Sequence, residues 1–292
     1  MKPLRLKIQE EVSLKQAPMH VIEKDYALSY VLAGIALQPQ LSHSLIFKGG
    51  TALKKIFFGD YRFSEDLDFS VIDAPTGKAL ENCLDAAIQI SKQLLNNYGP
   101  FDIQLKRYPE RSPHPKGQDA FNVFVKFPWH SDSSLCRVKL EITHDEPVIL
   151  SPVYKSILHD YSEQIDGDVA CYHIEEIVAE KLRALLQTHQ KLVTRGWNRP
   201  RARDYYDLWC ILKKYSATVD HARLIEVLNK KCMHRSVSYQ KVDDFFTEEL
   251  SKEAYQHWQA TLGTLVKDLP DCKQVLDETK NVSCHNRRGA IT

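Results

Sequence analysis

The sequence predicts an α/β N-terminal half followed by an all-α C-terminal half. Segments with alternating apolar residues, typical of strands, are interspersed with helical patterns up to about residue 165, and no strand pattern is evident beyond that point. A chain of 292 residues is long enough for one large domain or two modest ones, each with its own core. We therefore expect two domains, residues 1–165 and residues 166–292.

The composition is that of an ordinary globular protein and excludes several classes. The net charge of +1 creates no overall field that attracts nucleic acid, so any such affinity must come from local patches. No signal-peptide pattern and no apolar run of membrane length is present, so we expect a cytoplasmic protein without membrane contact. The seven scattered cysteines have no C-x-x-C spacing, which favours reduced thiols over disulfides or a zinc site.

The first half begins with a helix predicted over 20–37 and a short buried strand over 44–47 that ends at Gly49-Gly50. Thr51 opens a brief helix that ends near residue 59. The period-two pattern over 63–71 predicts a strand with one apolar face and one polar face. The remaining predicted elements of this half are a helix over 77–96, a proline-rich loop over 106–119, and an antiparallel hairpin of strands 121–127 and 136–143.

The second half reads as helices throughout. Helical periodicity and the absence of strand alternation predict them over 173–190, 203–215, 219–231 and 240–267. The last ten residues, 283–292, are expected to form a mobile tail.

Asp66 and Asp68 lie two residues apart on the predicted strand 63–71, so their side chains share one face. Two neighbouring carboxylates repel each other, and a hard divalent cation such as Mg²⁺ offsets that repulsion. Magnesium bound by two carboxylates keeps positions for water and phosphate oxygens, as phosphoryl transfer requires. The alternative is the solvated face of an ordinary strand, which Asp-x-Asp alone does not exclude.

Two further features favour the metal interpretation. Gly49-Gly50 lies between a strand and a helix, where backbone N–H groups can receive an anion and glycine permits close approach. Glu141 adds a third carboxylate on the polar face of strand 136–143. Taken singly, the glycines form a plain tight turn and Glu141 is an exposed strand residue. Together, the three elements predict a nucleotide–metal site.

Lys181 occupies the centre of the apolar face of the predicted helix 173–190. It is either a lysine whose stem packs at the edge of the core or an ammonium that contacts a triphosphate, whereas Arg183 is expected to be solvated. Asp204, near the start of the next helix, is either an acid that stabilises the helix N-terminus or a site residue. Asp207 shares roughly the same face and is expected to orient Arg203 or Lys181.

The segment KLVTRGWNRPRAR, residues 191–203, contains five basic residues, no acidic residue and one tryptophan. Arginine and tryptophan together suit contact with phosphates and stacking on an unpaired base. The alternative is a solvated loop. The candidate RNA-binding residues are Arg195, Trp197, Arg199, Arg201 and Arg203.

The order of these motifs resembles the polymerase-β-type nucleotidyltransferase superfamily: a strand, Gly-Gly, a short helix, S-x-D-x-D, and later a strand with a glutamate between apolar residues. More narrowly, the stretches FKGGTALKK, RFSEDLDF, EKDY, EKLRALL and RARDYYDL are similar to motifs of the AbiEii/AbiGii toxin family. The resemblance runs from about residue 20 to residue 215. Fifteen residues separate Gly50 from Asp66, a spacing that is long for the superfamily but not for the narrower family.

The resemblance implies a nucleotidyltransferase fold, with a small mixed sheet flanked by helices and a helical domain that completes the active-site cleft. It implies transfer of a nucleoside monophosphate from an NTP, with Mg²⁺ or Mn²⁺ as cofactor and pyrophosphate as product. Lys181 and Asp204 fall on the family's lysine and last aspartate motifs. The expected metal ligands are Asp66, Asp68 and Glu141, the expected nucleotide-binding residues are Gly49, Gly50, Thr51, Ser64 and Lys181, and the expected catalytic residues are Asp66, Lys181, Asp204, Ser64 and Glu141.

The acceptor is inferred partly from the resemblance, since some family members modify the 3′ end of tRNA and are encoded beside an antitoxin. We therefore expect an RNA acceptor, with tRNA favoured, and a cognate antitoxin as partner. Three alternatives differ in class: nucleotide transfer to a Ser, Thr or Tyr hydroxyl of a protein, a non-catalytic relative that binds a nucleotide or partner, and a metal-dependent phosphohydrolase. The third does not need the G-G-T turn, and an inactive relative would not be expected to retain the full set of carboxylates.

Overall fold

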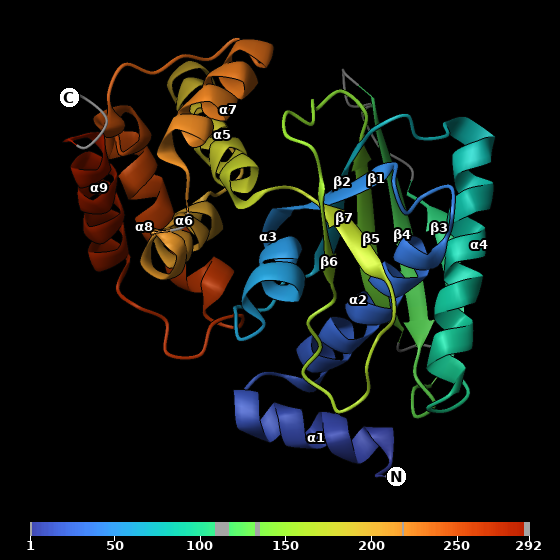
Figure 1. Cartoon of the computed structure of the whole chain (residues 1–292). Coiled ribbons are helices and arrows are strands. Elements are labelled where there is room, and N and C mark those ends of the chain that lie inside the picture. The colour runs from blue at the N-terminus through green and yellow to red at the C-terminus, as the bar shows by residue number, and fades with distance from the viewer. Residues whose placement is uncertain (1, 109–116, 132–134, 218, 289–292) are drawn as a thin grey trace. The chain divides into compact units, whose positions relative to one another are not determined.

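The computed structural model describes residues 2–108, 117–131, 135–217 and 219–288 and divides into two compact units, Met1–Tyr172 and His173–Thr292. The first unit combines a sheet with helices, and in the second the described residues form helices (Figure 1). The predicted fold class, α/β followed by an all-α region, is confirmed. One detail was wrong, because strand β7, Asp168–Cys171, lies beyond residue 165.

The described residues of the first unit form a seven-stranded mixed sheet with the order β3-β4-β5-β2-β1-β7-β6. Central strand β2 runs parallel to β5 and antiparallel to β1, while β4 and β5 form the predicted antiparallel hairpin. The strands other than β7 are β1 Leu45–Lys48, β2 Asp66–Val71, β3 Asp102–Arg107, β4 Gln118–Lys126, β5 Cys136–Thr143 and β6 Val153–Ser156.

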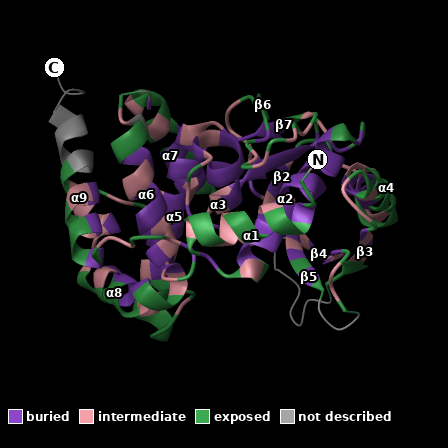
Figure 2. Cartoon of the chain, turned by 90° about the horizontal axis from the view of Figure 1, so that it is seen from below, coloured by how far each residue is buried: buried purple, intermediate pink, exposed green. Residues whose placement is uncertain are grey.

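Helix α2, Met19–Leu37, is apolar on nearly all sides and is therefore buried along most of its length. It packs against β5, β7 and the amphipathic helix α4, Gly77–Asn96, which also contacts β3. Figure 2 shows the contrast between the largely buried α2 and the exposed outer side of α4. The other helices of this unit are α1 Leu4–Lys15, α3 Gly49–Ala52 and the π-helical turn η1 Leu53–Phe58.

The sequence pattern did not predict α1, β3, β6 or β7. Strand β6 is the last strand of the sheet and three of its four residues are exposed, and β3 at the opposite edge has only one buried residue. Edge strands that bury so few side chains lack the alternation that identifies a strand. The proline-rich loop predicted over 106–119 is shorter, since β3 reaches Arg107 and β4 begins at Gln118, and residues 109–116 lie outside the described residues.

The second unit contains three departures from the prediction. The helical segment 272–282, the first part of helix α9, was not predicted. The helix predicted over 240–267 is divided, because the Thr247 hydroxyl accepts a hydrogen bond from the Leu250 N–H and begins a new helix. The predicted mobile tail is helical over 283–288, and residues 289–292 lie outside the described residues. The helical elements are α5 Ile174–Arg195, α6 Ala202–Tyr215, α7 His221–His234, η2 Val242–Phe245, α8 Glu248–Leu262 and α9 Cys272–Arg288.

Across the part of the chain that the structure describes, no helix combines the length and the apolar character needed to cross a membrane.

Candidate active site

The polar face of the central sheet carries a compact set of charged side chains. Strand β2 pairs Asp66 with Lys139 and Asp68 with Glu141 on β5, and Asp68 also pairs with Lys48 on β1. Paired residues of neighbouring strands share one face of a sheet, so these five side chains lie on the face opposite to Leu67 and Phe69. Three carboxylates and two ammonium groups therefore share this face.

Glu141 does not point freely towards the two aspartates. Its Oε1 accepts a hydrogen bond from Lys139 Nζ at 2.5 Å, on the same strand. Among the described residues, no three His, Cys, Asp or Glu side chains lie close enough to hold a metal ion together. A contact between Glu141 and a metal would therefore require its bond to Lys139 to be shared or broken.

The donor set does fit magnesium held by two carboxylates. Asp66 and Asp68 are half-buried on one strand face, and Gly49 presents no side chain towards Asp68. Magnesium usually takes one or two protein carboxylates and fills its other positions with water and substrate phosphates. The predicted pair, Asp66 and Asp68, meets this requirement without a third protein ligand.

The two glycines are required by neighbouring side chains. Gly49 has φ +80°, and a Cβ added there would lie 2.6 Å from Asp68 Oδ2. A Cβ on Gly50 would lie 2.4 Å from a terminal guanidinium nitrogen of Arg62. The Asp68 carboxylate thus lies against Gly49, and the Arg62 guanidinium lies against Gly50. Substitution of either glycine would displace one of these charged groups.

A chain of hydroxyl groups links the turn to strand β2. Thr51 Oγ1 is 2.5 Å from the Asp66 carbonyl oxygen and 2.7 Å from Ser64 Oγ. The Asp66 carbonyl only accepts, so the single Thr51 proton is donated there, and Ser64 then donates to Thr51. Thr51 therefore holds the backbone of Asp66 against the glycine turn, and Ser64 is positioned next to it.

Buried charged residues also stabilise the glycine turn. Helix α2 directs Asp25, part of the EKDY stretch, at the π-helical turn that follows the glycines. Asp25 Oδ2 accepts a hydrogen bond from Lys55 Nζ at 2.7 Å, and Lys54 Nζ lies 4.0 Å from Asp25 Oδ1. Burial raises the pKa of the Asp25 carboxyl, but Lys55 and Lys54 outweigh it and hold that pKa below its ordinary value. The ionised Asp25 thereby fixes the turn to the core.

In the second unit, Lys181 lies between two carboxylates. Its Nζ donates to Asp204 Oδ1 at 2.8 Å and to Asp207 Oδ2 at 2.6 Å. Lys181 is 8% exposed and the Asp207 side chain is fully buried, so the ammonium does not reach solvent as a lysine at the core edge would. Asp207 thus contacts Lys181, one of the two residues that it is expected to orient. The prediction for Arg183 was wrong, since that side chain is buried.

Arg201 also belongs to this cluster of charged residues. One of its terminal nitrogens lies 3.2 Å from Asp204 Oδ2, and its Nε donates to Thr188 Oγ1 at 3.0 Å. Burial raises the pKa of Asp204, but Lys181 and Arg201 outweigh it and keep that pKa below its usual range. The backbone N–H of Arg201 donates to Glu253 Oε2 at 3.3 Å. Two cations and two aspartates therefore lie together, and the Glu253 carboxylate lies beside them.

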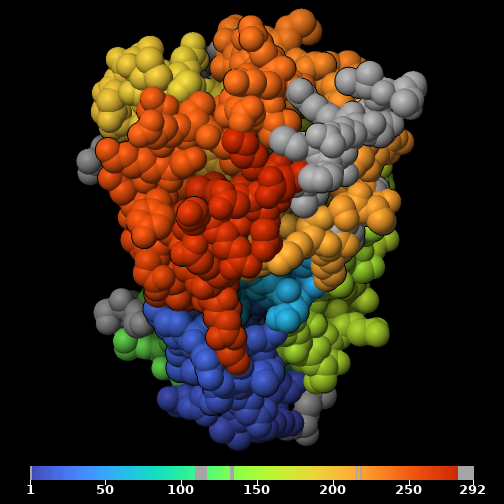
Figure 3. Space-filling model, turned by 90° about the vertical axis from the view of Figure 1, so that its left-hand side faces the viewer, coloured from blue at the N-terminus to red at the C-terminus, as the bar shows by residue number. Residues whose placement is uncertain are grey.

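The basic segment 191–203 divides into an exposed part and an inward part. Arg195, Trp197 and Arg199 are exposed, and Trp197 is 71% exposed. The segment around residue 195, yellow in Figure 3, is visible at the surface of the chain. Arg201 contacts Asp204, and Arg203 Nε donates to the Thr261 carbonyl at 3.2 Å. Of the five candidate RNA-binding residues, the first three are therefore available to a ligand at the surface.

The sequence reasoning did not single out Lys48, Arg62, Asp25 or Glu253. Three of these stand inside stretches that it did quote, FKGGTALKK, RFSEDLDF and EKDY. For Lys48, the available signal was its position directly before the glycine turn. Nothing local identifies Glu253, because its role depends on a contact with Arg201, 52 positions away.

Solved structures of nucleotidyltransferases share this fold. The fold is similar to that of MenT4, a nucleotidyltransferase toxin from Mycobacterium tuberculosis H37Rv, with a TM-score of 0.63 at 17% identity over 96% of this chain and 88% of that chain. It is also similar to JHP933 from Helicobacter pylori, with a TM-score of 0.57 at 18% identity over 94% of both chains.

Residues 30–281 match the family model described as nucleotidyl transferase AbiEii toxin, type IV TA system. Because the match spans most of the sequence, the chain belongs to the AbiEii family of nucleotidyltransferase toxins of toxin–antitoxin systems. This confirms the predicted family and the predicted class of enzyme. None of the curated proteins compared with the chain is a significant match.

Proposed function

We propose that this nucleotidyltransferase toxin transfers a nucleoside monophosphate from an NTP to an RNA, with the 3′ end of tRNA as acceptor, in the presence of Mg²⁺ or Mn²⁺. The observation that carries the RNA acceptor is the exposed Trp197 between the exposed Arg195 and Arg199. An exposed indole flanked by guanidinium groups suits an unpaired base and its phosphates. A protein acceptor would not require this combination.

The glycine turn and its surroundings are proposed to bind the triphosphate. The backbone of Gly49-Gly50 stands next to Arg62, whose guanidinium adds positive charge beside the turn. Ser64 can donate its hydroxyl proton to a phosphate oxygen by giving up its bond to Thr51. The turn is rigid because Thr51 is tied to the Asp66 backbone, so little order is lost when the nucleotide binds.

Asp66 and Asp68 are proposed to hold the metal ion. When bound, Mg²⁺ neutralises charge on the phosphate oxygens and favours ionisation of the acceptor hydroxyl. In the transfer, the acceptor oxygen forms a bond to the α-phosphorus, and the bond from that phosphorus to the bridging oxygen breaks to release pyrophosphate. The hydroxyl proton passes to a carboxylate or to water. We assign this carboxylate to Glu141, which pairs with Asp68 on the neighbouring strand.

Lys181 and Asp204 are assigned to the same reaction because they stand on the lysine and last aspartate motifs of the family. Asp204 and Asp207 hold the Lys181 ammonium by two hydrogen bonds, so its position is fixed. A fixed ammonium of this kind stabilises the charge that builds up on phosphate oxygens.

Incubation of the full chain with total tRNA, Mg²⁺ and each α-labelled NTP in turn tests the proposal. Transfer of label to tRNA by the wild type, and not by Asp66→Ala, is the expected result. Label on a protein band in place of tRNA would overturn the RNA acceptor and favour nucleotide transfer to a protein hydroxyl. Absence of transfer to either acceptor by the folded protein would overturn the proposed reaction.

Two matched pairs of variants test the RNA surface. Trp197→Ala is compared with Tyr255→Ala, since both remove an exposed aromatic ring from the second unit. Arg199→Ala is compared with Lys252→Ala, since both remove one exposed positive charge. We expect only the first of each pair to weaken RNA binding, with a loss of about 1–3 kcal/mol for the tryptophan and a shallower salt dependence for the arginine.

Membership of the family also implies a cognate antitoxin.

A further inference from the structure

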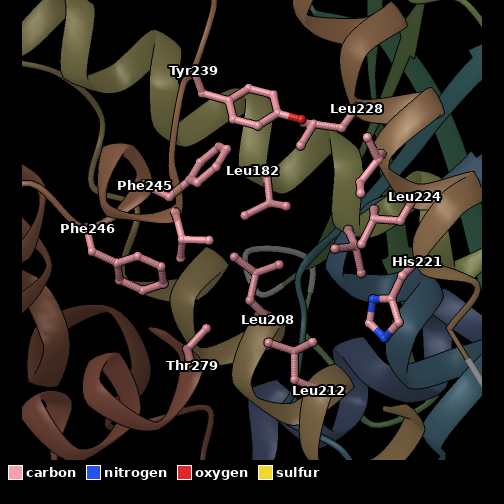
Figure 4. Close-up of a pocket in the computed structure, with 13 residues that line it drawn as sticks. Leu182, Leu208, Leu212, His221, Leu224, Leu228, Tyr239, Phe245, Phe246 and Thr279 are labelled. Atoms are coloured by element: carbon pink, nitrogen blue, oxygen red, sulfur yellow. The ribbon is translucent and has the colours of Figure 1, made fainter. Parts of the chain in front are cut away.

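A pocket of about 110 Å³ opens within the helical unit, apart from the cluster around Lys181. Its walls come from α5, α6, α7, the turn η2 and α9 (Figure 4). All of these elements belong to the same compact unit, so the pocket is a property of one fold.

The lining is almost entirely carbon. Leucines of α5, α6 and α7, among them Leu182, Leu208 and Leu224, face a second wall that contains the rings of Phe245 and Phe246. Figure 4 shows the leucine side chains pointing towards the space between these walls. An apolar wall opposite an aromatic one suits a flat hydrocarbon ring, which gains dispersion contacts on both faces.

The few polar groups at the pocket have partners in the protein. The Tyr239 hydroxyl donates to Asn229 Oδ1 at 3.0 Å, and the Thr279 hydroxyl donates to the Val275 carbonyl at 2.6 Å. His221, at one end of the pocket in Figure 4, is the remaining polar side chain of the lining. Water needs two to four polar partners to settle in a cavity, and most of this lining is apolar.

The volume matches a small ligand and not a macromolecule. An apolar cavity of about 150 Å³ in another protein stays dry and binds benzene, and the present pocket is only somewhat smaller and is open at its rim. A helix with side chains is about 10 Å across, so a partner helix would not enter. One ring with at most one polar substituent fits.

We propose that this pocket binds a compact, uncharged, mainly apolar molecule of about one ring, with any polar substituent at the His221 end. Such a ligand would contact α5, α6 and α7 at once. Leu182 directly follows Lys181 on α5, and Leu208 directly follows Asp207 on α6. The ligand would therefore pack against the two helices that hold the Lys181–Asp207 pair.

Titration of the full chain with fluorobenzene, followed by ¹⁹F NMR, tests the site directly and does not depend on enzymatic activity. Leu224→Trp fills the pocket from a half-buried rim position. Met233→Trp is the matched control, since it places the same ring on the same helix at a residue that is 77% exposed and outside the pocket. We expect saturable binding to the wild type and to Met233→Trp, and at least tenfold weaker binding to Leu224→Trp.

The chemical class is tested with 4-fluorobenzoate, which has the same ring and a carboxylate, and should bind at least tenfold more weakly than fluorobenzene. Ile225→Trp also fills the pocket, from a more exposed position. It replaces Leu224→Trp in the test if that variant does not fold. Non-saturable binding to the wild type would overturn the proposal. Equal binding to the folded filling variants and to Met233→Trp would overturn it as well.

Discussion

Replacement of Gly49 by alanine separates backbone strain from disturbance of the predicted metal ligand. Gly49 and Gly77 both have positive φ, +80° and +56°. A Cβ on Gly77 meets nothing within 4 Å, whereas a Cβ on Gly49 lies 2.6 Å from Asp68 Oδ2. Gly77→Ala is therefore a control that carries the same kind of backbone strain without touching the candidate site.

The magnitudes follow from these two geometries. Forcing an alanine into the left-handed region costs roughly 1–2 kcal/mol of stability, and we expect this loss in both variants. At Gly49, ordinary contact begins at 3.4 Å, so the Asp68 carboxylate must retreat by about 0.8 Å, the difference from 2.6 Å. A misplacement of about 1 Å at a reacting centre can cost about 100-fold in rate. Gly49→Ala should therefore lose about 100-fold in kcat, and Gly77→Ala should lose little.

The assay is transfer of an α-labelled nucleotide at saturating NTP, with thermal unfolding measured on the same preparations. Equal losses of stability with unequal losses of kcat would confirm the reasoning. If Gly49→Ala retains activity within about threefold of Gly77→Ala while remaining folded, then the position of the Asp68 carboxylate does not limit the reaction and the argument fails.

Three further predictions concern buried charges. Asp207→Asn weakens the hydrogen bond to Lys181. This variant should lower stability by about 1.5–3 kcal/mol and kcat by at least tenfold. An unchanged kcat in steady-state assays would show that Asp207 has only a structural role. Lys231 and Glu176 are both fully buried, and their charged groups lie 3.1 Å apart. Lys231→Met should therefore lower the free energy of unfolding by about 3–5 kcal/mol, measured in urea, and the added change Glu176→Leu should recover most of that loss. A double variant no more stable than the single variant would contradict this. Burial raises the pKa of Glu163, but hydrogen bonds lower it to about 2 from an ordinary 4.5, so the stability that its carboxylate contributes is fully present above pH 4.5 and is lost as the pH falls towards 2. Glu163→Gln should lose this acid dependence, and an unchanged stability–pH profile would refute the assignment.

Tryptophan fluorescence suits the unfolding measurement for the second unit. Three of the four tryptophans, at 197, 209 and 258, belong to that unit, and the fourth, Trp129, belongs to the first. The Lys231 and Asp207 variants should therefore shift a transition that dominates the fluorescence signal. The Glu163 variant is better followed by circular dichroism at wavelengths where the sheet contributes.

The elements that the sequence predicted well are those with long or clean periodicity. The buried helix over 20–37, the strand with Asp66 and Asp68, and the hairpin of β4 and β5 were all confirmed. The elements that it missed bury few side chains, as β6 does, or are short, as β7 is. The division of the predicted helix 240–267 was missed although Thr247, followed by Glu248 and Glu249, is a local signal for the start of a helix.

Within the candidate site, the sequence by itself determined which residues share a face. The two-residue period of a strand places Asp66 and Asp68 together, and the spacing of a helix places Asp204 and Asp207 on one side, whatever the rest of the chain does. The glycine pair before the helix and the basic segment with its tryptophan were equally visible, because each is a local run of residues.

Only the tertiary structure decided which partner each charged group takes. Lys181 meets aspartates 23 and 26 positions away, Glu141 bonds to Lys139 and not to a neighbouring strand, and Arg62 packs on Gly50. The apolar pocket likewise exists only where five helical elements meet. The physical reason is that periodicity specifies direction along one element, whereas pairing and cavity shape depend on how separate elements pack, which no local pattern contains.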